Sequence, residues 1–206
     1  MQARKRMPDC AWVRQKALLI LLAAPLAVAG QELARPADRL VAAAVAQTGS
    51  KVNYDGSYRS IPYPGGDVPE TIGVCTDVVI RAYRHVGVDL QVKVHEDMKR
   101  AFKAYPQLWG LSRPDPSIDH RRVPNLQTFF QRAGAELPVS GDPRVYRAGD
   151  LVTWMLPGNA PHVGVVIGEK SATDTPLVVH NIGRGPEVED ILFRYPITGH
   201  YRYRTE

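Results

Sequence analysis

The amino-acid sequence predicts an α+β protein in which N-terminal helices pack against a C-terminal antiparallel β-sheet. Apolar residues recur at helical spacing before Gly141, whereas short runs rich in valine, isoleucine and leucine follow it. Because the helices precede the strands and do not alternate with them, the order favours an antiparallel sheet over βαβ units. The sequence contains no internal repeat, low-complexity tract or second domain.

Helical periodicity marks several segments in the first part of the chain. The predicted helices span residues 36–49, 74–86, 95–105 and 124–133. Gly49 and Gly87 follow two of the apolar stripes, as glycine often follows the last turn of a helix. Pro124 suits a first helical turn, because the amide hydrogen that it lacks would have no partner within the helix.

Two long segments between these helices are expected as loops. Residues 50–72 are rich in glycine, proline and tyrosine, and residues 109–124 are longer than a simple connector needs. The core of the second loop, 118–122, combines an apolar anchor with a dense group of charges, unlike a disordered linker. Since loops of this length are usually functional or disordered, we expect an ordered loop that borders the active site.

Strands are expected after Gly141. Three apolar runs, at residues 151–155, 162–167 and 177–182, have the length and composition of buried strands. Polar and apolar residues alternate at 200–203, which we interpret as an edge strand. These segments together form the predicted sheet.

The first 29 residues have the composition of a secretory signal peptide. Basic residues flank an apolar run at 17–24, and Ala27-Val28-Ala29 forms a small-residue cleavage site. The alternative is an uncleaved membrane anchor, but Pro25 interrupts the apolar stretch, which is shorter than the roughly 20 residues of a spanning helix. We therefore expect export to the periplasm or the exterior, with residues 30–206 as one domain that has no integral membrane segment.

The net charge of +5 belongs mostly to the export signal. Residues 1–29 hold five basic residues and one acidic residue, Asp9, so their removal leaves a mature chain of about +1. This balance gives no reason to expect nucleic acid as a partner. The oligomeric state is unknown from the sequence.

Cysteine usage singles out one residue. Cys10 lies in the signal peptide, so Cys75 is the single thiol of the mature chain. Exported proteins normally pair their thiols, and a lone thiol is either buried and inert or chemically active. Cys75 stands at the expected start of a helix, where free amides and the helix dipole lower a thiol pKa. We interpret it as a nucleophile, with an inert core residue as the alternative.

A nucleophilic cysteine requires a base within hydrogen-bond reach and a group that orients the base. His85 is excluded, because it lies near the end of the helix that Cys75 begins, roughly 15 Å away along the axis. His162 and His180 stand at the ends of apolar strands, where a polar side chain needs a function or at least a hydrogen-bond partner. These two histidines are the expected base and its orienting partner.

Two strand motifs resemble those of NlpC-type cell-wall cysteine peptidases. They are Gly-Asp-Leu-Val at 149–152 and Pro-His-Val-Gly-Val-Val-Ile-Gly at 161–168. The resemblance implies a papain-like α+β fold, with the nucleophile at a helix start packed on the antiparallel sheet. It also implies that Cys75 is the nucleophile, His162 the base and His180 the third catalytic residue.

The resemblance extends beyond the two strand motifs. A tyrosine in the loop before the nucleophile corresponds to Tyr63, and Asn181 is the alternative third residue if His180 faces the other side of the sheet. The mature chain is similar to a little-characterised subfamily of secreted bacterial proteins grouped with these peptidases, and the stretch 109–126 is typical of it. The usual Asp-Cys-Ser-Gly around the nucleophile is Val-Cys-Thr-Asp at 74–77, which leaves the substrate open.

Charged residues near the predicted site have two interpretations each. The cluster at 119–122 is either a solvated loop or a site where Arg121 or Arg122, beside His120, binds a substrate carboxylate. Asp77 is either a first-turn acid favoured by the helix dipole or a residue that binds a substrate amine.

Export and the resemblance together imply hydrolysis of an amide bond in peptidoglycan stem peptides through a thioester, with no cofactor. One alternative is metal binding by Cys75, His162 and His180, which are valid zinc ligands but lack the paired spacing of zinc fingers. The other alternative is a cell-wall binding module whose site has lost activity.

Overall fold

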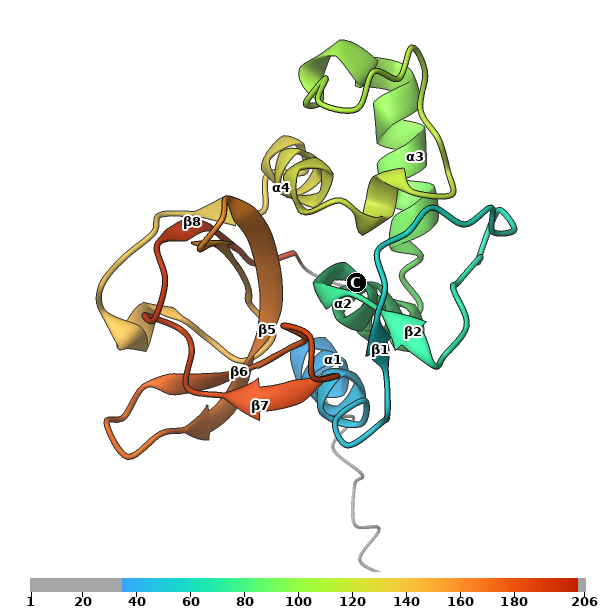
Figure 1. Ribbon diagram of the computed structural model, residues 1–206. Coiled ribbons are helices and arrows are strands. Elements are labelled where there is room, and N and C mark those ends of the chain that lie inside the picture. The colour runs from blue at the N-terminus through green and yellow to red at the C-terminus, as the bar shows by residue number, and fades with distance from the viewer. Residues whose placement is uncertain (1–34, 204–206) are drawn as a thin grey trace, which may run out of the picture. The chain divides into compact units, whose positions relative to one another are not determined.

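The computed structural model describes residues 35–203, in which helices accompany an antiparallel six-stranded sheet (Figure 1). The strands lie in the order β3-β8-β4-β5-β6-β7, and each neighbouring pair is antiparallel. This arrangement confirms the predicted α+β class. The strands of the sheet are β3 (Glu136–Leu137), β4 (Leu151–Leu156), β5 (Ala160–Lys170), β6 (Pro176–His180), β7 (Glu187–Glu189) and β8 (Ile197–Tyr201).

The α-helices of the described part fall close to the predicted segments. They are α1 (Pro36–Val45), α2 (Cys75–His85), α3 (Leu90–Ala101) and α4 (Val123–Arg132). The third helix begins earlier than predicted, because the Asp89 side chain accepts the amides of Gln91 and Val92 and caps its N-terminus. Three short 3-10 helices add η1 (Phe102–Ala104), η2 (Asp119–Arg121) and η3 (Pro143–Val145).

The prediction that residues 200–203 form an edge strand is wrong, because the strand there is not at the edge of the sheet. Strand β8 lies between β3 and β4, because the short β3, which the sequence did not reveal, pairs on its outer side. The loop at 50–72 also contains a short strand, β1 (Asn53–Tyr54). It pairs in parallel with β2 (Ile72–Gly73), directly before α2.

One side of the sheet packs against α1, α2 and α4, and we call it the helix side (Figure 1). Neighbouring residues of a strand face opposite sides, so alternate residues of β5 enter this core. The residues that β5 contributes to it are Val163, Val165 and Ile167, all of them buried. Cys75 belongs to the same core, which places the start of α2 against β5.

The opposite side of the sheet is built around Trp154, and we call it the Trp154 side. Trp154 is fully buried, and its indole nitrogen donates to the carbonyl of Leu192 at 2.9 Å. His162 is its cross-strand partner, with ring centroids 5.9 Å apart. Val166, which lies four residues after His162 on β5, belongs to this second core. The sheet therefore places the His162 ring beside an aromatic ring.

The predicted signal peptide and Cys10 lie outside the described residues. Within residues 35–203, no helix combines the length and the apolar character of a membrane span.

Gly164 is a position where the sheet tolerates no side chain. A Cβ atom there would lie 2.5 Å from Cγ1 of Val178 and 3.0 Å from the carbonyl oxygen of Val179. We expect Gly164→Ala to lower the free energy of unfolding by about 1–3 kcal/mol, because the packed strands must move apart. Urea denaturation measures this loss. Gly168→Ala is the control on the same strand, since its Cβ would meet nothing within 4 Å; equal losses would contradict the explanation.

Candidate active site

Cys75 is the first residue of α2, as the sequence predicted. The preceding residue, Val74, has extended backbone angles, and its amide donates to Oδ2 of Asp77 at 2.7 Å. Through this bond the Asp77 side chain caps the N-terminus of the helix. The thiol therefore lies at the N-terminus of α2, where the first amides have no carbonyl partner within the helix, apart from that of Asp77, which donates to Val74 at 3.1 Å.

The thiol is buried, with 3% of the residue exposed. Burial raises the pKa of the Cys75 thiol to about 11, and the charge of Asp77 adds to this rise. Hydrogen bonds from the backbones of Val163 and Thr76 and from the Tyr54 hydroxyl act in the opposite direction. The low thiol pKa predicted from the helix start is wrong, because desolvation outweighs these donors.

The hydrogen bond from Val163 also locates the thiol relative to the sheet. Val163 directly follows His162 on β5, so the sulfur lies beside the backbone of the strand that carries the predicted base. Two segments that are distant in sequence thus place the predicted nucleophile beside the strand that carries the predicted base.

The tyrosine beside the thiol is Tyr54, which the sequence did not single out. Burial, followed by the charge and hydrogen bond of Cys75, raises the pKa of the Tyr54 phenol. Tyr63 lies elsewhere: it is partly exposed and its hydroxyl donates to Glu96 at 3.0 Å. The parallel pairing of β1 with β2 brings Tyr54 to the helix start, and no local sequence pattern predicts a two-residue pairing of this kind.

His162 and His180 meet on the Trp154 side of the sheet. Nε2 of His162 lies 3.0 Å from Nδ1 of His180, and the rings are perpendicular. Nε2 of His180 lies 3.1 Å from Oε2 of Glu189 on β7. Burial and the neighbouring charge of His180 lower the pKa of His162 to about 3, and burial also lowers the pKa of His180. Both imidazoles are therefore neutral near pH 7.

Asn181, the alternative third residue, takes no part in this contact. Its Oδ1 accepts the amide of Gly183 at 3.0 Å, and its buried Nδ2 has no partner within residues 35–203. The geometry favours His180 as the group that orients His162.

Asp77 and Arg121 form a buried ion pair at the start of α2. Nε and Nη2 of Arg121 bind the two carboxylate oxygens of Asp77 at 2.8 and 2.9 Å, with the side chains 2% and 3% exposed. The guanidinium also donates to the carbonyls of Asp55 and Ser57, and the Thr76 hydroxyl donates to the carbonyl of Arg121. The predicted loop thus contacts the first turn of α2. Because each charge already has a partner, the geometry favours structural roles over substrate binding.

The other members of the charged cluster are also engaged. The guanidinium carbon of Arg122 lies 4.0 Å from the centroid of the Trp109 ring, and Nη1 bonds Asp119 at 3.1 Å. His120 is buried, and burial lowers its pKa to about 4. Its buried Nδ1 finds no hydrogen-bond partner in the described part of the chain.

Metal ligation receives no support from the side chains. Among the described residues, no group of three or more His, Cys, Asp or Glu side chains is arranged to hold a metal ion. His162 and His180 bond each other through ring nitrogens instead.

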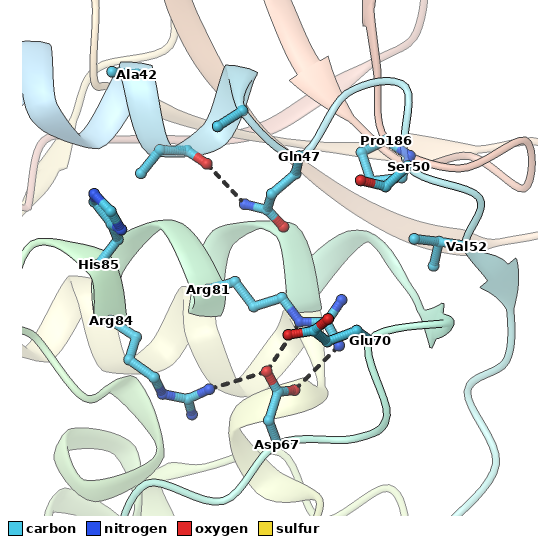
Figure 2. A pocket seen from close by; sticks show the side chains of 12 residues that line it. Ala42, Gln47, Ser50, Val52, Asp67, Glu70, Arg81, Arg84, His85 and Pro186 are labelled. Carbon is cyan, nitrogen blue, oxygen red and sulfur yellow. Dashed lines mark hydrogen bonds and ion pairs between the residues drawn. The ribbon is translucent and has the colours of Figure 1, made fainter.

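A cavity of about 700 Å³ lies between α1 and α2, away from the predicted catalytic residues. Figure 2 shows its charged wall, where Asp67 accepts from Arg81 at 3.0 Å and from Arg84 at 3.1 Å. This one carboxylate accepts hydrogen bonds from both guanidinium groups, and no cysteine lines the cavity. We therefore take the start of α2, and not this cavity, as the candidate site.

Comparison with known sequences places the chain in a family. A family model described as a domain of unknown function (DUF1287) matches residues 41–203. The chain belongs to the DUF1287 family. The DUF1287 chain is also similar to the uncharacterized protein YijF of Escherichia coli (strain K12), with 54% identity over 157 residues that cover 76% of this chain and 77% of that protein.

The DUF1287 chain was also compared with solved structures. NlpC1 from Trichomonas vaginalis matches 85% of this chain with 15% identity and a TM-score of 0.47. The match covers 47% of that structure, so the DUF1287 chain spans about half its length.

The buried ion pair generates a stability prediction for this DUF1287 protein. Arg121→Ala should lower the free energy of unfolding by about 3–5 kcal/mol, because it leaves the Asp77 carboxylate buried without its partner. Arg59→Ala is the control, since its pair with Asp55 is exposed and should contribute less than about 1 kcal/mol. Urea denaturation of both variants measures the difference, and similar small losses would contradict a structural role for Arg121.

The lowered pKa of His162 predicts how the stability of the DUF1287 protein depends on pH. The folded state binds a proton at His162 only near pH 3, whereas an ordinary histidine in the unfolded state binds it near 6.5. Stability should therefore fall as pH decreases from about 6.5 toward 3, because the unfolded state gains protons first. His162→Gln should show a shallower fall over this interval in urea denaturation. Parallel pH curves for the two proteins would contradict the shift.

Proposed function

We propose that this DUF1287 protein is a cysteine hydrolase that cleaves an amide bond in peptidoglycan peptides. The observation that carries the proposal is the placement of a buried thiol at a helix start beside β5, whose His162 is hydrogen-bonded to His180 of the neighbouring strand β6. Nucleophile, base and orienting group are the parts that thiol-based acyl transfer requires.

In the proposed reaction, His162 takes the proton of Cys75 while the sulfur attacks the carbonyl carbon of the substrate. The thiol and the imidazole are both neutral beforehand, since burial disfavours the charge on each, so proton transfer accompanies the attack. The amides of the first turn of α2 and the Tyr54 hydroxyl are the donors available to the oxyanion.

Collapse of the tetrahedral intermediate expels the amine, which receives the proton from His162, and leaves an acyl thioester on Cys75. Water then attacks the thioester, and His162 accepts its proton. This step releases a carboxylate product and regenerates the thiol. His180 orients the His162 ring throughout.

The substrate class follows from the proposed location and from the resemblance to NlpC-type peptidases. The N-terminal 29 residues carry the features of an export signal, which directs the chain to the compartment that contains the cell wall. Peptidoglycan stem peptides offer amide bonds there.

Digestion of purified peptidoglycan, with mass analysis of the released fragments, tests the proposal directly. The wild-type protein should release fragments that each gain one water, and Cys75→Ser should release none. His162→Ala should lower the rate by a factor on the order of 10² or more, because a positioned general base contributes at least this much.

His85→Ala is the matched control, since His85 lies at the other end of α2 from Cys75. It should leave the rate unchanged. Full activity in Cys75→Ser, or equal losses in both histidine variants, would exclude the proposed mechanism.

A further inference from the structure

The histidine pair does not end at His180. Its second ring nitrogen contacts Glu189, so three side chains from the adjacent strands β5, β6 and β7 form one hydrogen-bonded chain. His180 is fully buried, and the Glu189 side chain is 19% exposed. The Glu189 carboxylate is the last group of this chain of hydrogen bonds and the one nearest the solvent.

The register of β6 and β7 explains why Glu189 makes this contact. Glu187 lies directly opposite His180, and Glu189 lies opposite Val178 on the same face. A long side chain reaches a diagonal neighbour across a strand pair. Arg184 binds both glutamates, at 2.9 Å to Glu187 and 2.8 Å to Glu189, and so holds the carboxylate beside the ring.

The direction of every hydrogen bond in the chain follows from the carboxylate. An ionised carboxylate accepts hydrogen bonds only, so Nε2 of His180 carries the proton in this contact. A neutral imidazole has one N–H group, which leaves Nδ1 of His180 as an acceptor. Nε2 of His162 must then donate to it, and Nδ1 of His162 retains its lone pair.

We infer that Glu189 is a positioning residue, whose carboxylate sets the tautomer of His180 and, through it, makes Nδ1 of His162 the basic nitrogen. The inference rests on the proposed function of His162 as the base. A carboxylate that acts through one histidine on another also stabilises the positive charge that His162 acquires when it takes the thiol proton.

The test compares Glu189→Gln with Glu187→Gln in the full mature chain. A glutamine at 189 both donates and accepts, so it permits either tautomer of His180. Glu187→Gln likewise removes one negative charge that pairs with Arg184. Glu187, however, makes no hydrogen bond to the His180 ring. In the peptidoglycan assay, kcat should fall on the order of 10- to 100-fold in Glu189→Gln with KM unchanged, as for other carboxylates that orient functional histidines. Glu187→Gln should retain wild-type kcat.

A second measurement reads the tautomers without any substrate. Long-range ¹H–¹⁵N correlation spectra of the wild-type protein near neutral pH should show both His162 and His180 protonated on Nε2. The Nδ1-protonated form of His180 should become populated in Glu189→Gln and remain absent in Glu187→Gln.

The two measurements separate failure of this inference from failure of the proposed function. If the wild-type protein hydrolyses nothing while the tautomers shift as expected, the proposed function fails, and only the control of the histidine tautomers by Glu189 stands. Wild-type His180 protonated on Nδ1 overturns the inference even if Glu189→Gln does not fold. Identical tautomers in wild type and Glu189→Gln, or equal kcat losses in both glutamate variants, also overturn it.

Discussion

The buried ion pair between Asp77 and Arg121 is the interaction on which the geometry around the thiol depends. Asp77 caps α2 through the amide of Val74, and Arg121 binds the carbonyls of the segment that follows β1. One carboxylate therefore ties the start of α2 to η2 and to the strand that carries Tyr54. Neither charge is stable in this interior without the other, so these segments are expected to assemble together.

The sheet supplies the other half of the site by a different means. Hydrogen bonds between β4, β5 and β6 fix the backbone, and packing against Trp154 fixes the ring of His162. Gly164 leaves room for the neighbouring strand at the point where His180 approaches. Functional groups on strands of a packed sheet are held more precisely than groups on loops. The start of α2 thus holds the proposed nucleophile beside β5, and β5 and β6 hold the two histidines.

The sequence predicted those residues of the candidate site that local patterns encode. His162 and His180 were predicted because polar residues interrupt apolar strands, and the helix that begins at Cys75 was predicted from its periodicity. The sequence did not single out Tyr54 and Glu189, because they reach the candidate site through the pairing of β1 with β2 and through the register of β6 and β7. Such long-range pairing is invisible in a single sequence. The thiol pKa was predicted with the wrong sign, because the extent of desolvation depends on how completely the packed chain covers the sulfur.

Burial of the thiol has a further consequence for the durability of the protein. With a pKa of about 11, only on the order of one Cys75 in 10⁴ is a thiolate at pH 7. Oxidation to sulfenic acid and exchange with disulfides both proceed through the thiolate and require access to the sulfur. In the oxidising compartment proposed for the protein, the same desolvation that makes the resting nucleophile weak also protects it from oxidative loss between turnovers.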